Sequence, residues 1–480
     1  MLLSAAGFCI VALEALQFGS DMKHLNRPPE QDDLLRPCLV DLIDMGHEPV
    51  KLAALIDWEF FEREWVDFVP SGTGRSATPP RLVAGLMYLQ HLHDLSNEVV
   101  VARWVENLYY QHFTGETFFQ HQPPIHSSSL GCWRDQIGDE VAEWLLTKTI
   151  EAGRSNGVVN DDRLSRGSVD TNVMEHNIAY PTDARLYEQA RAKIVAPAQE
   201  AGVQLRQNYA RKASLPAAQV GRYAHARQFK RMRMALRTLK GFARRIMRAL
   251  RRQIDLILAG ALWHTVLDPL LLVSRLLHQA TRGSGKIYAL HEPNDDRISK
   301  SMARVRYEFG PEFSISAKID EGFVVEMRML PGNPYDGHTL VEALEQVKIL
   351  ADQRPELAFV DLGYRGHGVQ STQVLISGAK RGLTPGLKKL LRRRSPIEPE
   401  IEHMKTDGRL AKYPLKGSRG DAIFAVFCSC GHKLRKILRH LRSLLFYLLA
   451  AILNAIQNAL AKAAPPISRD THPHGMSCLI

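Results

Sequence analysis

The chain has 480 residues, of which 45% are hydrophobic and 24% are charged, as is typical of a soluble globular protein with two or three domains. The charge balance is basic, with 62 Lys and Arg against 51 Asp and Glu and a formal net charge of +11. A basic excess favours an acidic partner, of which nucleic acid is the commonest. The six cysteines are too scattered for a disulfide framework, so we expect a reducing cytoplasm.

Two apolar segments raise the question of a membrane. Residues 1–18 contain Glu14 and have no positive region before Met22, so we interpret them as upstream translated sequence, with Met22 as a candidate start. Residues 443–453 are too short to span a bilayer, and they predict a buried C-terminal helix. We therefore expect no membrane partner. Cys428, Cys430 and His432 lack the spacing of a zinc site, and the cysteines are interpreted as small buried residues on a helix.

Residues 36–150 predict a compact helical domain. Apolar residues recur at three- and four-residue steps in 81–92 and 98–113, with Ser96 as a candidate helix cap. A serine run at 127–129 predicts another cap and helix. Binding to DNA and a purely packing or dimerising role both stay open for this domain.

The pattern changes after residue 160. Helices are expected at about 338–352 and 398–405. The chain also has six β-like runs, at 166–171, 286–290, 313–319, 322–330, 357–360 and 374–376. Strands, a helix, a strand and a late helix predict an α/β layer structure.

A long polar and basic segment, at about 185–280, interrupts this pattern. Within it, residues 227–252 hold eleven Lys or Arg residues and no acid. Apolar and basic residues interleave there, which predicts a helix with one basic and one apolar face. A solvated charged face is the usual explanation of such a run, but the absence of acids favours contact with DNA phosphates. The basic face comprises Arg237, Lys240, Arg244, Arg248 and Arg251.

Three acids form a candidate site. Asp170 and Asp361 each end an apolar β-like run, and an acid there lies at the sheet edge where loops converge. Glu398 precedes Pro399 near a helix start, so its role could also be a simple interaction with the helix dipole. Three convergent carboxylates are the minimal ligand set for two divalent ions in phosphodiester chemistry. Cations that could grip phosphates flank Glu398, namely Arg392, Arg393, Arg394 and Lys405.

At these residues the chain resembles the DDE transposases of the IS-five group of bacterial insertion sequences, over roughly residues 36–440. SVDTNVMEHNIAYPTDARL (168–186) resembles the block of the first aspartate, and FVDLGYRGHG (359–368) that of the second. RRRSPIEPEIEHMKTDGRL (392–410) resembles the glutamate block. LPGNPYDGHTL (330–340) and CGHKLRKIL (430–438) resemble further family segments. The resemblance departs from the family at Leu391, Glu402 and Lys433, where tyrosine, glycine and asparagine are usual.

The resemblance implies an RNase H-like catalytic domain, a mixed sheet flanked by helices, at 160–440, with the basic helical insertion at about 185–280. A helical DNA-binding or assembly domain at 36–150 would precede it. A poorly ordered or non-native extension (1–35) and a C-terminal helix and tail (441–480) would complete the chain.

The resemblance also implies an activity and its partners. Asp170, Asp361 and Glu398 would hold two Mg²⁺ ions, or Mn²⁺ in their place. The protein would cut double-stranded DNA at the terminal inverted repeats of the element, and the freed 3′-hydroxyl would attack target DNA. It would work as a homodimer or larger assembly on DNA, in the cytoplasm with the nucleoid.

Two other functions fit the same residues. A nuclease of the same fold would cut without strand transfer, and a catalytically inactive remnant would only bind DNA. Weaker candidates for a role in the site lie in nearby turns, namely Asp183, His367, Asp336 and His338.

Overall fold

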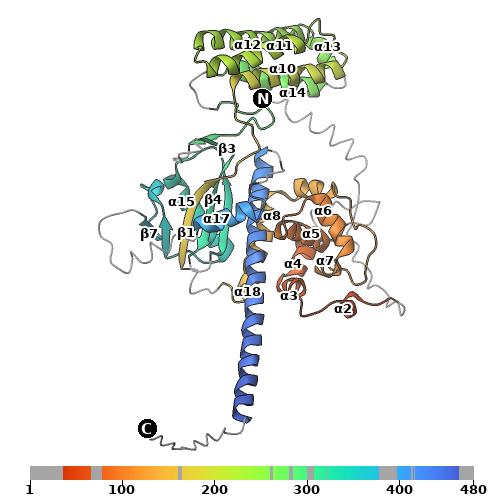
Figure 1. Cartoon of the computed structure of the whole chain (residues 1–480), viewed down its shortest axis with the longest axis vertical. Helices are drawn as coiled ribbons and strands as arrows, with labels where there is room; N and C mark the ends of the chain where they lie inside the picture. The colour runs from red at the N-terminus through yellow and green to blue at the C-terminus, as the bar shows by residue number, and fades with distance from the viewer. Residues whose placement is uncertain are drawn as a thin grey trace, which may run out of the picture.

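The fold combines a mixed β-sheet, a set of N-terminal helices, a helical insertion and one long C-terminal helix, as the computed structural model shows (Figure 1). It describes residues 36–65, 78–159, 165–259, 263–280, 285–299, 307–319, 322–377, 397–411, 415 and 417–463. The N-terminal extension, including Met22, and Arg392, Arg393, Arg394 and Leu391 lie outside these residues.

The predicted helical region is confirmed, with one correction. The segment 98–113 forms two helices, because the Asn107 side chain accepts hydrogen bonds from the amides of Tyr109 and Tyr110 and begins a new helix. Ser96 caps the first of them through the amide of Val99, as predicted. The helices are α2 (Leu39–Leu42), α3 (Glu48–Leu55), α4 (Trp58–Glu64), α5 (Pro80–Leu92), α6 (Asn97–Glu106), α7 (Leu108–Phe113) and α8 (Ser129–Ser155).

The sheet has five strands in the order β5-β4-β1-β6-β7. β4 pairs antiparallel with both β1 and β5. β6 pairs parallel with both β1 and β7. The strands are β1 (Arg166–Val173), β4 (Glu312–Lys318), β5 (Val324–Leu330), β6 (Leu357–Val360) and β7 (Gln373–Ile376). The predicted α/β layer is confirmed, and a short antiparallel pair, β2 (Arg297–Ser299) and β3 (Tyr307–Phe309), was not predicted.

Helices cover both faces of the sheet (Figure 1). On one face, Val169 packs with Leu340 and Leu344 of α15 (Asp336–Ala351). On the other face, Ile315 packs with residues of α17 (Ile397–Thr406) and α18 (Gly417–Ala463). Asp170 is paired with Ile315 across the antiparallel ladder, so the alternation of the strand places it on the α17 face.

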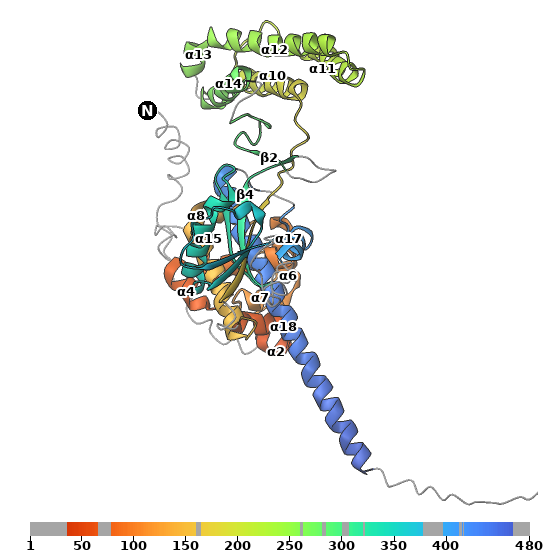
Figure 2. The ribbon, with the colours of Figure 1, turned by 90° about the vertical axis from the view of Figure 1, so that its left-hand side faces the viewer.

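The N-terminal helices share a core with the sheet. Trp104 and Leu145 belong to the same buried cluster as Phe323 and Val325 at β5, and Phe427 of α18 completes it. α18 runs between α8, α5 and β5, so one helix ties the N-terminal region to the sheet (Figure 2).

The insertion forms a helical bundle with its own core, standing away from the sheet (Figures 1 and 2). Its helices are α10 (Asp183–Glu200), α11 (Ala210–His225), α12 (Phe229–Arg251), α13 (Ile254–Ala259) and α14 (Trp263–His278). The strand predicted at 286–290 is wrong. Ile287 and Leu290 are buried in this core, and Lys193 Nζ donates a hydrogen bond to the backbone carbonyl of Leu290.

The C-terminal helix corrects a second prediction. α18 is buried up to Leu438, and Cys428 and Cys430 lie in its buried part, as expected. Residues 443–453, predicted to be buried, lie instead on the part that projects from the body (Figure 2). Phe446 and Tyr447 are 71% and 74% exposed. Residues 417–458 are long and apolar enough to cross a membrane by length and composition, although only 12% of the most apolar window is buried.

Candidate functional site

Asp170 and Asp361 lie at equivalent positions on neighbouring parallel strands. Ser168 of β1 is paired with Phe359 of β6, and each aspartate follows two residues later on its strand. Asp361 keeps an extended backbone, with φ −87° and ψ −174°, so the strand direction continues through it. Both aspartates therefore project from the same face just past the paired part of β1 and β6, and both are half-buried. β1 continues to Val173, paired with β4, so the prediction that Asp170 ends its strand is wrong.

Local hydrogen bonds orient the two carboxylates. Asp170 Oδ1 accepts from the amide of Thr171 at 3.0 Å. Asp361 Oδ1 accepts from the amide of Gly363 at 2.7 Å and so caps the short 3₁₀ helix Leu362–Tyr364. Each bond fixes the orientation of one carboxylate relative to its own backbone.

Helix α17 covers the face that carries Asp170. Ile401 and Met404 bury its inner side, and Lys405 Nζ donates to Asn172 Oδ1 at 3.2 Å. Asn172 is two residues from Asp170 and on the same face of β1. Glu398 lies seven residues before Lys405, hence on the same side of the helix, and its side chain is exposed.

A buried contact fixes α17 against α18. Glu400 lies 2.5 Å from Lys436 Nζ and 3.1 Å from His432 Nε2. Burial opposes the charge on Glu400, but His432 and Lys436 outweigh it and hold its pKa below the usual value. His432, considered above with the cysteines, thus pairs with a carboxylate of α17.

Asp336 is a further acid at this edge. Its Oδ1 accepts from the Thr171 hydroxyl at 2.8 Å, and it is the first residue of α15. A Cβ added to Gly363 would lie 2.4 Å from Asp336 Oδ2 and 2.9 Å from Asp361 Oδ1. Glycine therefore allows the carboxylates of Asp336 and Asp361 to approach the same backbone position.

The predicted acids share an edge but do not meet as one tight cluster. Among the described residues, one group of three acid or histidine side chains has ligand atoms within 4.8 Å of one another, and it does not include Asp170, Asp361 or Glu398.

The other candidates have local roles. Thr182 caps α10 through the amide of Arg185, so Asp183 is a first-turn residue and not the cap. His367 Nδ1 accepts from the Val369 amide at 3.1 Å. Glu402 of α17 is exposed. Lys433 is fully buried in α18, and burial lowers its pKa to about 7.

The basic face of α12 is exposed where it was expected. Arg237, Arg244, Arg248 and Arg251 are exposed, and Leu239, Ile246 and Leu250 are buried on the opposite side. Lys240 differs: it is half-buried, with Nζ 5.7 Å from the ring centre of Tyr187, and desolvation lowers its pKa. Leu236 and Phe242 are half-buried.

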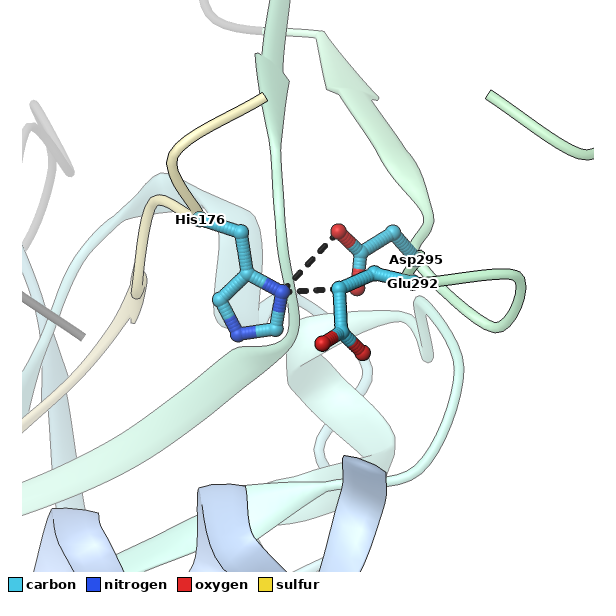
Figure 3. A group of neighbouring side chains, drawn as sticks. All are labelled: His176, Glu292 and Asp295. Carbon is cyan, nitrogen blue, oxygen red and sulfur yellow. Dashed lines mark hydrogen bonds and ion pairs between the residues drawn. The ribbon is translucent and has the colours of Figure 1, made fainter. Parts of the chain in front are cut away.

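A cluster that sequence reasoning missed joins three distant segments (Figure 3). His176 follows β1, Glu292 and Asp295 follow the insertion, and Asp421 lies in the first turns of α18. His176 Nδ1 lies 2.8 Å from Asp295 Oδ1, and Nε2 lies 3.2 Å from Asp421 Oδ1. All four are buried. Each residue looks ordinary in its own segment, so no local signal marked the group.

Comparison with known proteins gives two matches. Residues 37–136 match the family described as Transposase domain (DUF772), which here comprises α2 to α7 and the start of α8. The chain is also 44% identical over 199 residues to the uncharacterized protein ORF8 in the nfe locus of Rhizobium meliloti, covering 42% of this chain and 96% of that protein. No solved structure matches the chain.

Proposed function

This chain belongs to the same family as ORF8 of the nfe locus and contains a transposase domain, and we propose that it is a DDE transposase of the IS-five group. It would cut DNA at the ends of an insertion sequence and join them to target DNA. Asp170, Asp361 and Glu398 would be its catalytic acids, in the cytoplasm with the nucleoid.

One observation carries the proposal. Asp170 and Asp361 lie at equivalent positions of the neighbouring parallel strands β1 and β6, on the face that α17 covers, and α17 carries Glu398. The mixed sheet with helices on both faces is the architecture that an RNase H-like domain requires. The transposase-domain match lies outside this sheet, so the acids and the matched region support the proposal independently.

The acids at this edge suit a hard cation. Asp170, Asp361, Asp336 and Glu398 offer only carboxylate oxygens, which Mg²⁺ and Mn²⁺ prefer, and all but Glu398 are half-buried. We propose that Asp170, Asp361 and Glu398 would hold two such ions. When bound, they would supply charge stabilisation at the scissile phosphate and an acidified attacking water.

The chain's own residues would position the DNA. Water attacks the phosphorus and the bond to the 3′-oxygen breaks, which leaves a 3′-hydroxyl and a 5′-phosphate. In strand transfer that 3′-hydroxyl attacks a target phosphodiester and expels another 3′-oxygen. Lys405 anchors α17 over β1, and Arg244 and Arg248 of α12 would contact phosphates.

Handling two element ends requires two active sites, so we propose that a second copy pairs through the projecting part of α18. Seven large apolar side chains there are 43–74% exposed: Leu444, Phe446, Tyr447, Leu449, Ile452, Leu453 and Ile456. Large aromatic side chains such as Phe446 and Tyr447 contribute strongly to interfaces between protein chains.

Strand transfer separates this proposal from a nuclease of the same fold. The test incubates the full-length protein, Mg²⁺ and labelled DNA carrying the repeats that flank its gene with an unlabelled plasmid. We expect labelled ends joined covalently to the plasmid. Cleavage without joined product would support the nuclease, and the absence of both would support an inactive DNA-binding remnant.

A further inference from the structure

The buried cluster at the base of the insertion joins three parts of the chain. Glu292 Oε2 accepts weakly from the amide of Gly417 at 3.4 Å, at the start of α18. The ligand atoms of His176, Glu292 and Asp295 all lie within 4.8 Å of one another. In Figure 3 both dashed lines from the imidazole run to the Asp295 carboxylate, and the Glu292 side chain lies beside them.

The charges in this cluster do not balance. Glu292, Asp295 and Asp421 are each more than nine-tenths buried. In the described part of the chain, Asp295 and Asp421 form ion pairs with His176, and Glu292 has a ligand atom within 4.8 Å of those of His176 and Asp295. Burying three carboxylates against one imidazolium is costly, because buried charges are stable only when paired or bound to a metal.

The two sides of the imidazole have different surroundings. Nδ1 lies 2.8 and 2.9 Å from the two carboxylate oxygens of Asp295, with the Glu292 carboxylate in the same group, whereas Nε2 lies 3.2 Å from Asp421 Oδ1. A histidine that binds a metal through one nitrogen commonly donates its other N–H to a carboxylate, which fixes the ring. Asp421 occupies that orienting position, and it lies on a different element from the two acids.

We propose that His176 Nδ1, Asp295 and Glu292 form a binding site for one divalent transition-metal ion such as Zn²⁺, with Asp421 orienting the imidazole. One nitrogen and carboxylate oxygens suit Zn²⁺ better than Mg²⁺, which prefers oxygen alone. The ligand atoms would draw in by about 1 Å to reach zinc distances of roughly 2.0–2.2 Å. This site is separate from the acids Asp170 and Asp361.

The position of the site indicates what the metal would do. His176 lies where the chain leaves the sheet toward the insertion, and Glu292 and Asp295 lie where it returns. A metal bound there would join the segment that leaves the sheet to the segment that returns to it, and Asp421 would link both to α18. The metal would thus fix the basic bundle relative to the sheet. Binding to the folded state alone would also stabilise the protein.

The test uses full-length protein stripped with a chelator, dialysed against limiting Zn²⁺ and analysed by mass spectrometry for metal. We expect the wild-type protein to retain one equivalent of zinc. The control variants His291→Gln, at an exposed histidine, and Asp170→Asn, at the proposed catalytic site, should also retain it. His176→Gln and Asp295→Asn should lose it. Zinc should raise the melting temperature of the first three proteins only. Equal zinc content in His176→Gln and wild type would overturn the proposal.

A second measurement covers variants that fail to fold. Zinc-edge X-ray absorption of the wild-type protein should show one imidazole and oxygen ligands. A shell with sulfur, which would come from cysteines such as Cys132, or a shell without imidazole, would also overturn it. Because Asp170→Asn leaves this site intact, failure here is distinguishable from failure of the proposed catalytic site.

Discussion

Lys405 Nζ lies 3.2 Å from Asn172 Oδ1, which links helix α17 to strand β1 across 233 residues of chain. The contact is two residues from Asp170 on one side and seven from Glu398 on the other. It therefore sets where the helix that carries the proposed third acid lies over the strand that carries the first. Lys405, expected to grip DNA, is thus already engaged within the protein.

Asn172→Ala should weaken this anchor and lower DNA cleavage without lowering DNA affinity. Loss of one hydrogen bond to a charged amine costs about 1.5–3 kcal/mol, so we expect cleavage to fall roughly 10-fold or more. Single-turnover cleavage and a binding titration on the same DNA measure the two effects. Asn156→Ala, at the end of α8, is the control. An unchanged cleavage rate in Asn172→Ala would argue against the anchor.

The basic face of α12 should contribute to DNA affinity through phosphates. Replacing Arg244 and Arg248 together with Gln removes two exposed charges, so the slope of log K against log salt should shrink by about 2. Lys348→Gln with Arg439→Gln removes two exposed charges outside α12 and outside the N-terminal helices, and should leave the slope unchanged. The salt dependence is measured by fluorescence anisotropy. Equal slopes of log K against log salt for the two double variants would contradict the assignment of α12 to the DNA interface.

Lys433→Met should stabilise the protein, most strongly below pH 7. Burial lowers the pKa of Lys433 to about 7. Below that pH the folded protein buries a protonated amine, which lowers its free energy of unfolding. Between pH 7 and the pKa of about 10.5 in the unfolded chain, Lys433 is protonated more in the unfolded state than in the folded state. The free energy of unfolding of the wild type therefore rises with pH in this range.

The gain from Lys433→Met should be on the order of 2 kcal/mol at pH 6 and should shrink as the pH rises toward 10. Urea unfolding at several pH values measures it. Lys348→Met replaces an exposed lysine of α15 and should change stability little at any pH. A destabilised Lys433→Met would indicate that the amine has a favourable buried partner.

The projecting part of α18 should hold two copies together. Phe446 and Leu453 are seven residues apart on one side of the helix, and Glu at both should convert a dimer to a monomer without changing the melting temperature. Light scattering after size exclusion measures the mass, with Asn454→Glu and Gln457→Glu as the polar control pair. A wild type that is monomeric at tens of micromolar, or that sediments with lipid vesicles instead, would contradict this pairing.

The elements around the acids were predictable because their patterns are local. Apolar alternation marked β4, β5 and β6, and the run into Asp361 marked the edge where it lies. Asp361 could be placed at a strand end, but Asp170 lies inside β1, because pairing with β4 extends that strand to Val173. The adjacency of the two acids also required the register of β1 with β6, which no local pattern encodes. Residues 286–290 show the limit of such patterns, since side chains of the bundle satisfy their backbone instead of a neighbouring strand.

Contacts between distant segments could not be predicted. His176 and Asp421 are 245 residues apart, and Glu400 and Lys436 belong to different helices. Each side chain is ordinary in its own sequence context, and only the fold brings the partners together. The exposure of α18 beyond Leu438 could not be predicted either. An apolar sequence shows that burial would be favourable, but not whether another part of the protein covers it.

The central claim is metal-dependent cleavage by Asp170, Asp361 and Glu398, and the most direct test is the cleavage rate of single variants on DNA carrying the flanking repeats. Asp170→Asn, Asp361→Asn and Glu398→Gln keep the shape of each side chain and remove its charge. We predict that wild type and the exposed control Asp352→Asn cleave only with Mg²⁺ or Mn²⁺, and that each acid variant loses at least about 100-fold in rate while binding DNA normally. Cleavage at the wild-type rate by any of the three variants would contradict the assignment of that acid.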